Sequence, residues 1–107
     1  GSSSNCQGIK VAATSTAGTD IHRAVAGTTD IDEVWLWASD TDTSAIVLTI
    51  EFGGVTDPDD LIVVTVAASS TELVCPGLIM QNGVDIKAFA GTGNKISIFG
   101  YANRMDI

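Results

Sequence analysis

The chain has 107 residues, with 5 basic and 13 acidic side chains and a formal net charge of −8. This length suits a single domain with a single core, because domains commonly hold about 100–150 residues. The scattered Lys and Arg argue against binding to nucleic acid or to an anionic membrane, both of which need clustered positive charge. The apolar runs are too short to span a bilayer.

Short runs rich in Val, Ile, Thr and Ala alternate with Gly, Asp, Ser and Asn along the chain, and helical periodicity is absent. This spacing predicts strands of a sandwich or barrel. The predicted strands are 9–14, 20–26, 32–38, 45–52, 61–67, 72–75, 84–90 and 95–101. About eight short strands favour an all-β, antiparallel two-sheet sandwich of the jelly-roll kind. We expect residues 1–8 to form a flexible N-terminal arm and residues 9–107 the sandwich domain.

Two polar segments predict hairpins. Asn82-Gly83 is the strongest short hairpin signal, because both residue types accept a positive φ. The segment 91–94, Gly-Thr-Gly-Asn, is expected to close the last hairpin of the chain.

Trp35 and Trp37 lie two residues apart, so they share one face of the predicted strand 32–38. The other face carries Val34, Leu36 and Ala38, which are apolar too. A strand with one wet face should be apolar on one face only. We therefore interpret the tryptophan pair as part of the core and of a subunit contact. A sugar-stacking platform is the alternative, since aromatic rings suit that task.

Three further predicted strands also carry apolar or aromatic groups on a second face. They are 61–67, 84–90 with Phe89, and 95–101 with Phe99 and Tyr101. Together with the tryptophan strand they predict one contiguous patch, and large apolar patches mark interaction surfaces.

His22 is the single histidine of the chain. A zinc site needs several His or Cys ligands, and a catalytic triad needs a nucleophile beside the histidine. We find no such constellation and expect His22 to be a surface or interface residue. The sequence therefore predicts no enzyme.

Acidic residues cluster in two predicted loops, with Asp40 and Asp42 in one and Asp57, Asp59 and Asp60 in the other. Calcium prefers such oxygen ligands. Neither loop has the spacing of an EF-hand. We favour solvated turns in which the Asp side chains bond local backbone, and we expect no metal and no cofactor.

The two cysteines, Cys6 and Cys75, allow a disulfide or two reduced thiols. Two cysteines do not make a disulfide framework. Reduced thiols, with Cys75 half-buried beside Pro76, are the favoured interpretation.

Four stretches, at 24–37, 48–54, 76–83 and 96–104, resemble the head decoration (capsid cement) proteins of tailed bacteriophages. They include Asp-Glu-Val-Trp-Leu-Trp at 32–37 and Ile-Ser-Ile-Phe-Gly-Tyr at 96–101. The resemblance spans about residues 21–104 and rests on structural rather than catalytic elements. It does not separate the head from the neck, the tail or the base of a head fibre.

The resemblance implies a non-enzymatic virion protein, a homotrimer that binds the major capsid protein on the outer surface of a head assembled in the host cytoplasm. It implies no catalytic residue. We expect a small set of residues to form the subunit or capsid interface, and these are Trp35, Trp37, Phe89, Phe99, Tyr101, Cys6 and Gln7. The alternative function is a carbohydrate- or receptor-binding module of a phage fibre or tail.

Overall fold

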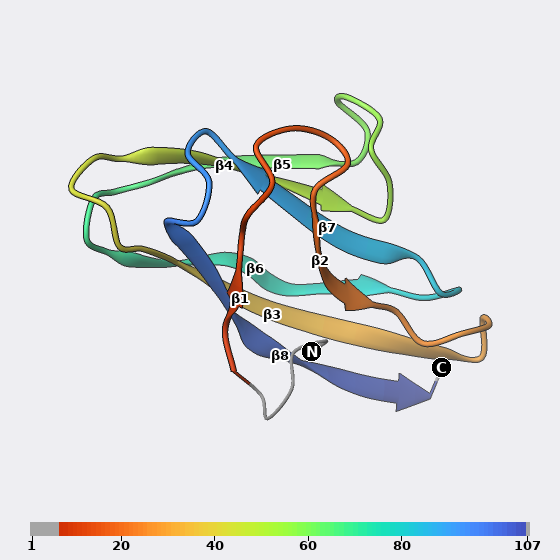
Figure 1. Ribbon diagram of the computed structural model, residues 1–107. Coiled ribbons are helices and arrows are strands. Elements are labelled where there is room, and N and C mark those ends of the chain that lie inside the picture. Colours follow the sequence, from red (N-terminus) through yellow and green to blue (C-terminus); the bar gives the residue numbers. More distant parts are fainter. Residues whose placement is uncertain (1–6, 107) are drawn as a thin grey trace.

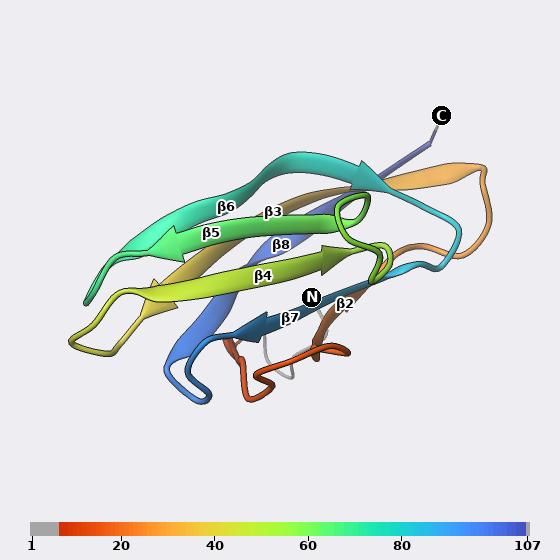
Figure 2. The ribbon, with the colours of Figure 1, turned by 90° about the horizontal axis from the view of Figure 1, so that it is seen from above.

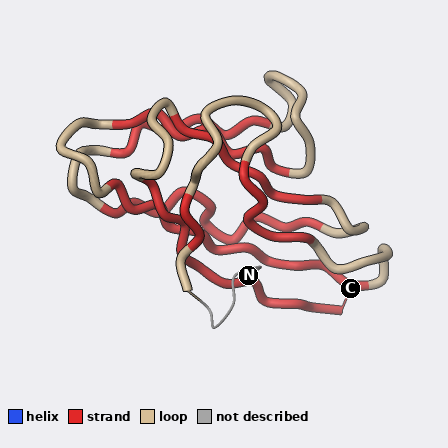
Figure 3. The backbone as a smooth tube through the Cα atoms, in the orientation of Figure 1, coloured by secondary structure: helices blue, strands red, loops and turns tan. Residues whose placement is uncertain are grey.

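The computed structural model describes residues 7–106, which form eight strands and no helix (Figure 3). Among these residues there is accordingly no helix that could cross a membrane. Each strand overlaps one predicted from the sequence. The strands are β1 (Ile9–Lys10), β2 (Thr19–Arg23), β3 (Asp30–Asp40), β4 (Ile46–Phe52), β5 (Leu61–Val66), β6 (Thr71–Met80), β7 (Asp85–Ala90) and β8 (Ile96–Asp106).

The strands form two four-stranded sheets that lie face to face (Figures 1 and 2). Sheet A has the order β1-β8-β3-β6, and sheet B has the order β2-β7-β4-β5. The first strand pairs with the eighth, the second with the seventh, the third with the sixth and the fourth with the fifth, all antiparallel. This pairing of the two halves of the chain across two sheets is the jelly-roll arrangement, which confirms the predicted fold class.

The two predicted hairpins are wrong, although the turn at Asn82-Gly83 is present. Asn82 has a φ of 62° and Gly83 a φ of 68°, as a tight turn of this sequence requires. The turn joins β6 of sheet A to β7 of sheet B, and the segment 91–94 joins β7 to β8 of sheet A. Among the described strands, β4 and β5 are the one consecutive pair that are hydrogen-bonded neighbours.

The core lies between the two sheets and is built from alternate residues of the long strands. On β3 the buried residues are the even-numbered ones, which include Val34, Leu36 and Ala38. Because alternate residues of a strand point to the same face, this half of β3 faces sheet B. The other large core residues with the lowest exposure are Ile21, Ile96, Leu48, Ile50, Val66 and Ile86.

Strands β3 and β8 pair over eleven positions, from Asp30 opposite Asp106 to Asp40 opposite Ile96. Gly100 lies opposite Leu36 in this ladder. A Cβ atom at Gly100 would overlap the carbonyl oxygen of Trp35 and would lie 3.0 Å from the Cα of Leu36. The two longest strands of sheet A can therefore approach each other at this point only because residue 100 has no side chain.

We predict that Gly100→Ala destabilises the fold by about 1–3 kcal/mol or more, because the added carbon meets backbone that cannot move aside. Urea unfolding followed by tryptophan fluorescence measures the change. Gly91→Ala is the matched control, since a Cβ there would have its nearest neighbour, the Val47 carbonyl oxygen, 3.9 Å away. Equal unfolding midpoints for the two variants would contradict the assignment of close packing at Gly100.

Candidate functional site

The outer face of β3 carries both tryptophans. Burial alternates along the strand, with even-numbered residues buried and odd-numbered residues half-buried. Trp35 and Trp37 occupy odd positions and point away from sheet B, so the expectation that they belong to the core is wrong. Alternation alone could not decide this, because both faces of the strand are apolar.

Neighbouring strands extend this surface on both sides. On β8, Tyr101 lies opposite Trp35 and Phe99 opposite Trp37. Phe99 is 47% exposed and Tyr101 is 49% exposed. On β6, three residues continue the apolar surface because they lie opposite odd-numbered residues of β3. Leu73 lies opposite Trp37, Pro76 opposite Trp35 and Ile79 opposite Glu33. We call the whole surface the aromatic face, and it consists of Trp35, Trp37, Phe99, Tyr101, Leu73, Pro76 and Ile79.

Three of the four rings of the aromatic face contact one another. The ring centroids of Trp35 and Trp37 lie 6.5 Å apart with an interplanar angle of 23°, and those of Trp37 and Tyr101 lie 6.1 Å apart at 33°. The indole Nε1 of Trp35 donates a hydrogen bond of 2.9 Å to Oε1 of Glu33, which also accepts one of 3.3 Å from Nδ2 of Asn103. These two hydrogen bonds lower the pKa of Glu33. The stacked rings are thus held in position without a ligand.

Gly77 shapes the surface beneath Trp35. Leu78 pairs with Val34 and Pro76 pairs with Trp35, so Gly77 is an extra residue in β6 and forms a β-bulge. Its φ is +75°, and a Cβ there would lie 2.9 Å from Cζ2 of Trp35. The indole therefore covers a residue that has to be glycine.

The structure brings together four of the seven predicted site residues, namely Trp35, Trp37, Phe99 and Tyr101. Phe89 lies on β7, where it alternates with the core residues Ala88 and Ala90, so it is on the outer face of sheet B. The prediction of one contiguous patch is therefore wrong. Its members at 61–67 and 84–90 belong to sheet B, and the aromatic face is completed by β6 instead.

The remaining predicted site residues lie near the N-terminus. Gln7 is exposed and lies just before β1, where it borders a cavity of about 220 Å³ at the edge of the sandwich. The lining of this cavity is mostly apolar and includes Ile21, Leu36 and Ile98. Cys6 lies outside the described residues.

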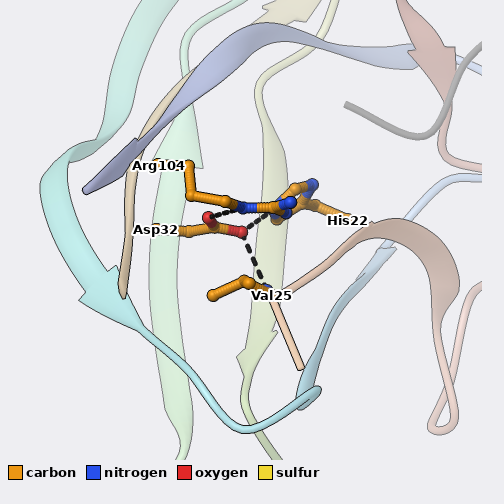
Figure 4. A network of polar contacts seen from close by, with 4 residues as sticks. All are labelled: His22, Val25, Asp32 and Arg104. Atoms are coloured by element: carbon orange, nitrogen blue, oxygen red, sulfur yellow. Dashed lines mark hydrogen bonds and ion pairs between the residues drawn. The ribbon is translucent and has the colours of Figure 1, made fainter. Parts of the chain in front are cut away.

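A buried carboxylate, Asp32, joins three strands near the same cavity (Figure 4). Oδ1 of Asp32 accepts a hydrogen bond of 3.1 Å from Nε of Arg104, and Oδ2 accepts one of 3.1 Å from the Val25 amide. Nε2 of His22 lies 3.0 Å from Oδ2 and carries the hydrogen, because a carboxylate can only accept. The side chains of His22 and Asp32 are 11% and 1% exposed. Of the two predicted settings for His22, the exposed surface is wrong, and the interface stays a prediction.

This network links the two sheets, because His22 belongs to sheet B while Asp32 and Arg104 belong to sheet A. Burial by itself raises the pKa of Asp32, but the hydrogen bonds from Arg104, His22 and Val25 outweigh it and hold the pKa below its usual value. Asp32 therefore stays charged in the fold, and we assign it the role of holding the sheets together.

Cys75 is fully buried rather than half-buried, and it is a free thiol. Burial raises its pKa to about 11. A thiol with this pKa is a poor nucleophile at neutral pH, since the thiolate is the reactive form.

The two acidic loops differ from each other. The turn at 57–60 is a solvated turn as predicted, with Asp57 and Asp59 exposed and Oδ2 of Asp60 bonded to the Thr56 amide. Asp40 is not in a loop. Asp40 is the last residue of β3 and is only 2% exposed. Its Oδ1 accepts a hydrogen bond from the Asp42 amide. The predicted local bonding is confirmed, whereas the predicted solvation of Asp40 is wrong.

We predict that Asp32→Asn lowers the free energy of unfolding at pH 7 by about 1.5–3 kcal/mol, because charge-assisted hydrogen bonds are lost. Since the folded pKa of Asp32 is depressed, its contribution is present above the unfolded pKa and is lost as the pH falls through the folded value. The difference in the free energy of unfolding between wild type and variant should therefore become smaller as the pH falls.

Urea unfolding of both proteins between pH 7 and pH 3 checks this dependence. Asp20→Asn serves as the control, because Asp20 is 80% exposed and meets Lys87 only at 3.7 Å. A gap that stays constant down to pH 3 would show that Asp32 is not a charged, hydrogen-bonded carboxylate in the fold.

Comparison with known proteins adds no relative to this picture. No protein-family model matches the chain, and neither a curated protein nor a solved structure matches it. The resemblance to head decoration proteins stays a prediction made from the sequence.

Proposed function

We propose that the protein decorates the head of a tailed bacteriophage and docks on the major capsid protein through the aromatic face. The observation that supports this function is the set of contacting aromatic rings on the outer face of the two central strands of sheet A, where Phe99 and Tyr101 are 47% and 49% exposed. Burying such rings against a protein surface contributes about 25 cal/mol per Å² of apolar area, before the costs of association.

The size of the face fits a site that acts in several copies. Strands lie about 4.8 Å apart and alternate residues about 6.8 Å apart, so three strands and three rows cover about 300 Å². A stable protein interface buries about 800 Å² on each partner. A flat area of this size is smaller than that, so we expect the faces of several copies to dock together, as in a trimer on a repeating lattice. Linking the sites in one oligomer raises the affinity without new contacts.

The charge of the chain supports the same role. A net charge of −8 keeps copies displayed side by side from aggregating. The seven residues of the aromatic face carry no charge, and the one carboxylate in the same rows, Glu33, lies opposite Ile79 and accepts hydrogen bonds from Trp35 and Asn103. Docking there therefore covers a carboxylate that already has hydrogen-bond donors.

Carbohydrate binding is the second candidate. The indole of Trp35 is fixed by Glu33 before any ligand arrives, and a fixed, stacked pair of rings is a good platform for a sugar. The aliphatic border formed by Leu73, Pro76 and Ile79 favours a protein partner instead, because it offers a sugar no hydrogen bonds.

We predict that Trp37→Ala weakens binding to purified heads lacking the protein by about 30-fold or more, the loss typical of a central aromatic anchor. Co-sedimentation across a concentration series measures the dissociation constant. Phe89→Ala is the matched control, because it removes an aromatic ring from the outer face of the other sheet. Failure of the wild type to sediment with the heads, or an equal loss for both variants, would overturn the proposal.

Two further measurements separate the candidates. Native mass spectrometry of the isolated wild type should show a trimer, and a monomer that ignores the heads would contradict decoration. Titration with soluble oligosaccharides should leave the tryptophan fluorescence unchanged. A saturable change that Trp37→Ala abolishes would favour the sugar site.

A further inference from the structure

Three loops are tied together at the end of the sandwich where β3 stops (left in Figure 1). The carbonyl oxygen of Asp42 accepts hydrogen bonds of 3.1 Å from the Ser69 amide and 3.3 Å from the Ser69 hydroxyl. The amide of Thr41 donates a hydrogen bond of 3.0 Å to the Lys95 carbonyl. Hydrogen bonds therefore join the β3–β4 connection to the β5–β6 and β7–β8 connections, and we call these three connections the cap.

Asp40 points from the end of β3 into this cap. It shares the inner face with Ala38, and the residue is 2% exposed. Its Oδ1 has the Asp42 amide as donor at 2.8 Å, but its Oδ2 is buried and has no hydrogen-bond partner among the described residues. An unpaired buried carboxylate oxygen is costly, because nothing replaces the water that it loses.

A second unsatisfied carboxylate oxygen lies on the next strand. Glu72 is opposite Ala38 in the β3–β6 ladder, so it shares the inner face with Asp40. The Asp40 amide donates to the Ser70 carbonyl at 2.9 Å, which keeps the two strands paired at this point. Glu72 is thus a diagonal neighbour of Asp40, a relation that places Cα atoms about 7–8 Å apart. Its Oε2 is buried and also without a partner among residues 7–106.

Among residues 7–106, no positive side chain forms an ion pair with these oxygens. The ion pairs found within the described chain involve other residues, and none of them includes Asp40, Glu72 or the nearby Lys95. Asp32, at the opposite end of the inner face of β3, shows the contrast, because its two oxygens have three donors.

We propose that Asp40 and Glu72 bind a calcium ion between the ends of β3 and β6. Calcium takes six to eight oxygen ligands in flexible geometry and accepts carboxylates, backbone carbonyls and water together. The described residues hold no group of three His, Cys, Asp or Glu side chains that could bind a metal ion, so the proposed site has two carboxylates and needs backbone carbonyls and water as its other ligands. The net charge of −8 raises the local concentration of cations. The site does not depend on the proposed capsid role.

The test is thermal unfolding of the full chain in EDTA, in 5 mM CaCl2 and in 5 mM MgCl2. Calcium should raise the melting temperature of the wild type by about 5–10 °C relative to EDTA, and magnesium should raise it much less. Asp40→Asn and Glu72→Gln should each lose most of the calcium shift. Asp57→Asn is the control, because it removes an acidic residue from an exposed turn, and it should keep the full shift.

Equilibrium dialysis of the wild type with calcium should give one bound ion per chain, and this readout needs no variant to fold. An unshifted melting temperature with no bound calcium would overturn the site. It would also be overturned if Asp40→Asn kept the full shift.

Discussion

Both faces of strand β3 are apolar, and the need to cover both of them is the constraint on which the rest of the structure depends. Its inner face packs against sheet B and its outer face carries the two tryptophans. The long partners β8 and β6 lie on its two sides and extend both faces. Core and aromatic face are therefore two sides of one layer, and a change in the register of β3 would exchange them.

The inner face of β3 is apolar in the middle and ends in a buried carboxylate on each side. Asp32 forms hydrogen bonds with Arg104 and His22 and ties the sheets together at one end. Asp40 ends the strand at the other side with one oxygen unpaired. Both carboxylates lie on the inner face near an end of β3, but both oxygens of Asp32 have hydrogen-bond donors whereas Oδ2 of Asp40 has none among the described residues. This difference is the reason for assigning a cation to Asp40 and a structural role to Asp32.

Short runs rich in Val, Ile and Thr between turn residues predicted a strand at each of the eight places, because these residue types favour the pleated surface of a sheet. Strand β6 was predicted too short, since two bulges interrupt its alternation, so that Pro76 rather than Cys75 shares the outer face with Leu73 and Ile79. The Asn82-Gly83 turn was predicted correctly as a conformation and wrongly as a hairpin. A local φ preference does not specify which sheet the next strand joins.

The candidate site was partly predictable for the same reason. Residue type was enough to choose Trp35, Trp37, Phe99 and Tyr101. The order of the strands decides that residues of β6 join them on one face and that Phe89 lies on the other sheet. The pairing of Asp32 with Arg104 joins residues 72 positions apart, and no local pattern reports it.

The central claim is that the aromatic face is a surface that a partner covers. Acrylamide quenching of tryptophan fluorescence tests it most directly, because both tryptophans of the chain lie on that face and acrylamide is uncharged. We predict that both rings are accessible to acrylamide in the free protein and that head binding lowers the quenching constant several-fold. An unchanged quenching constant in the bound state would contradict the account.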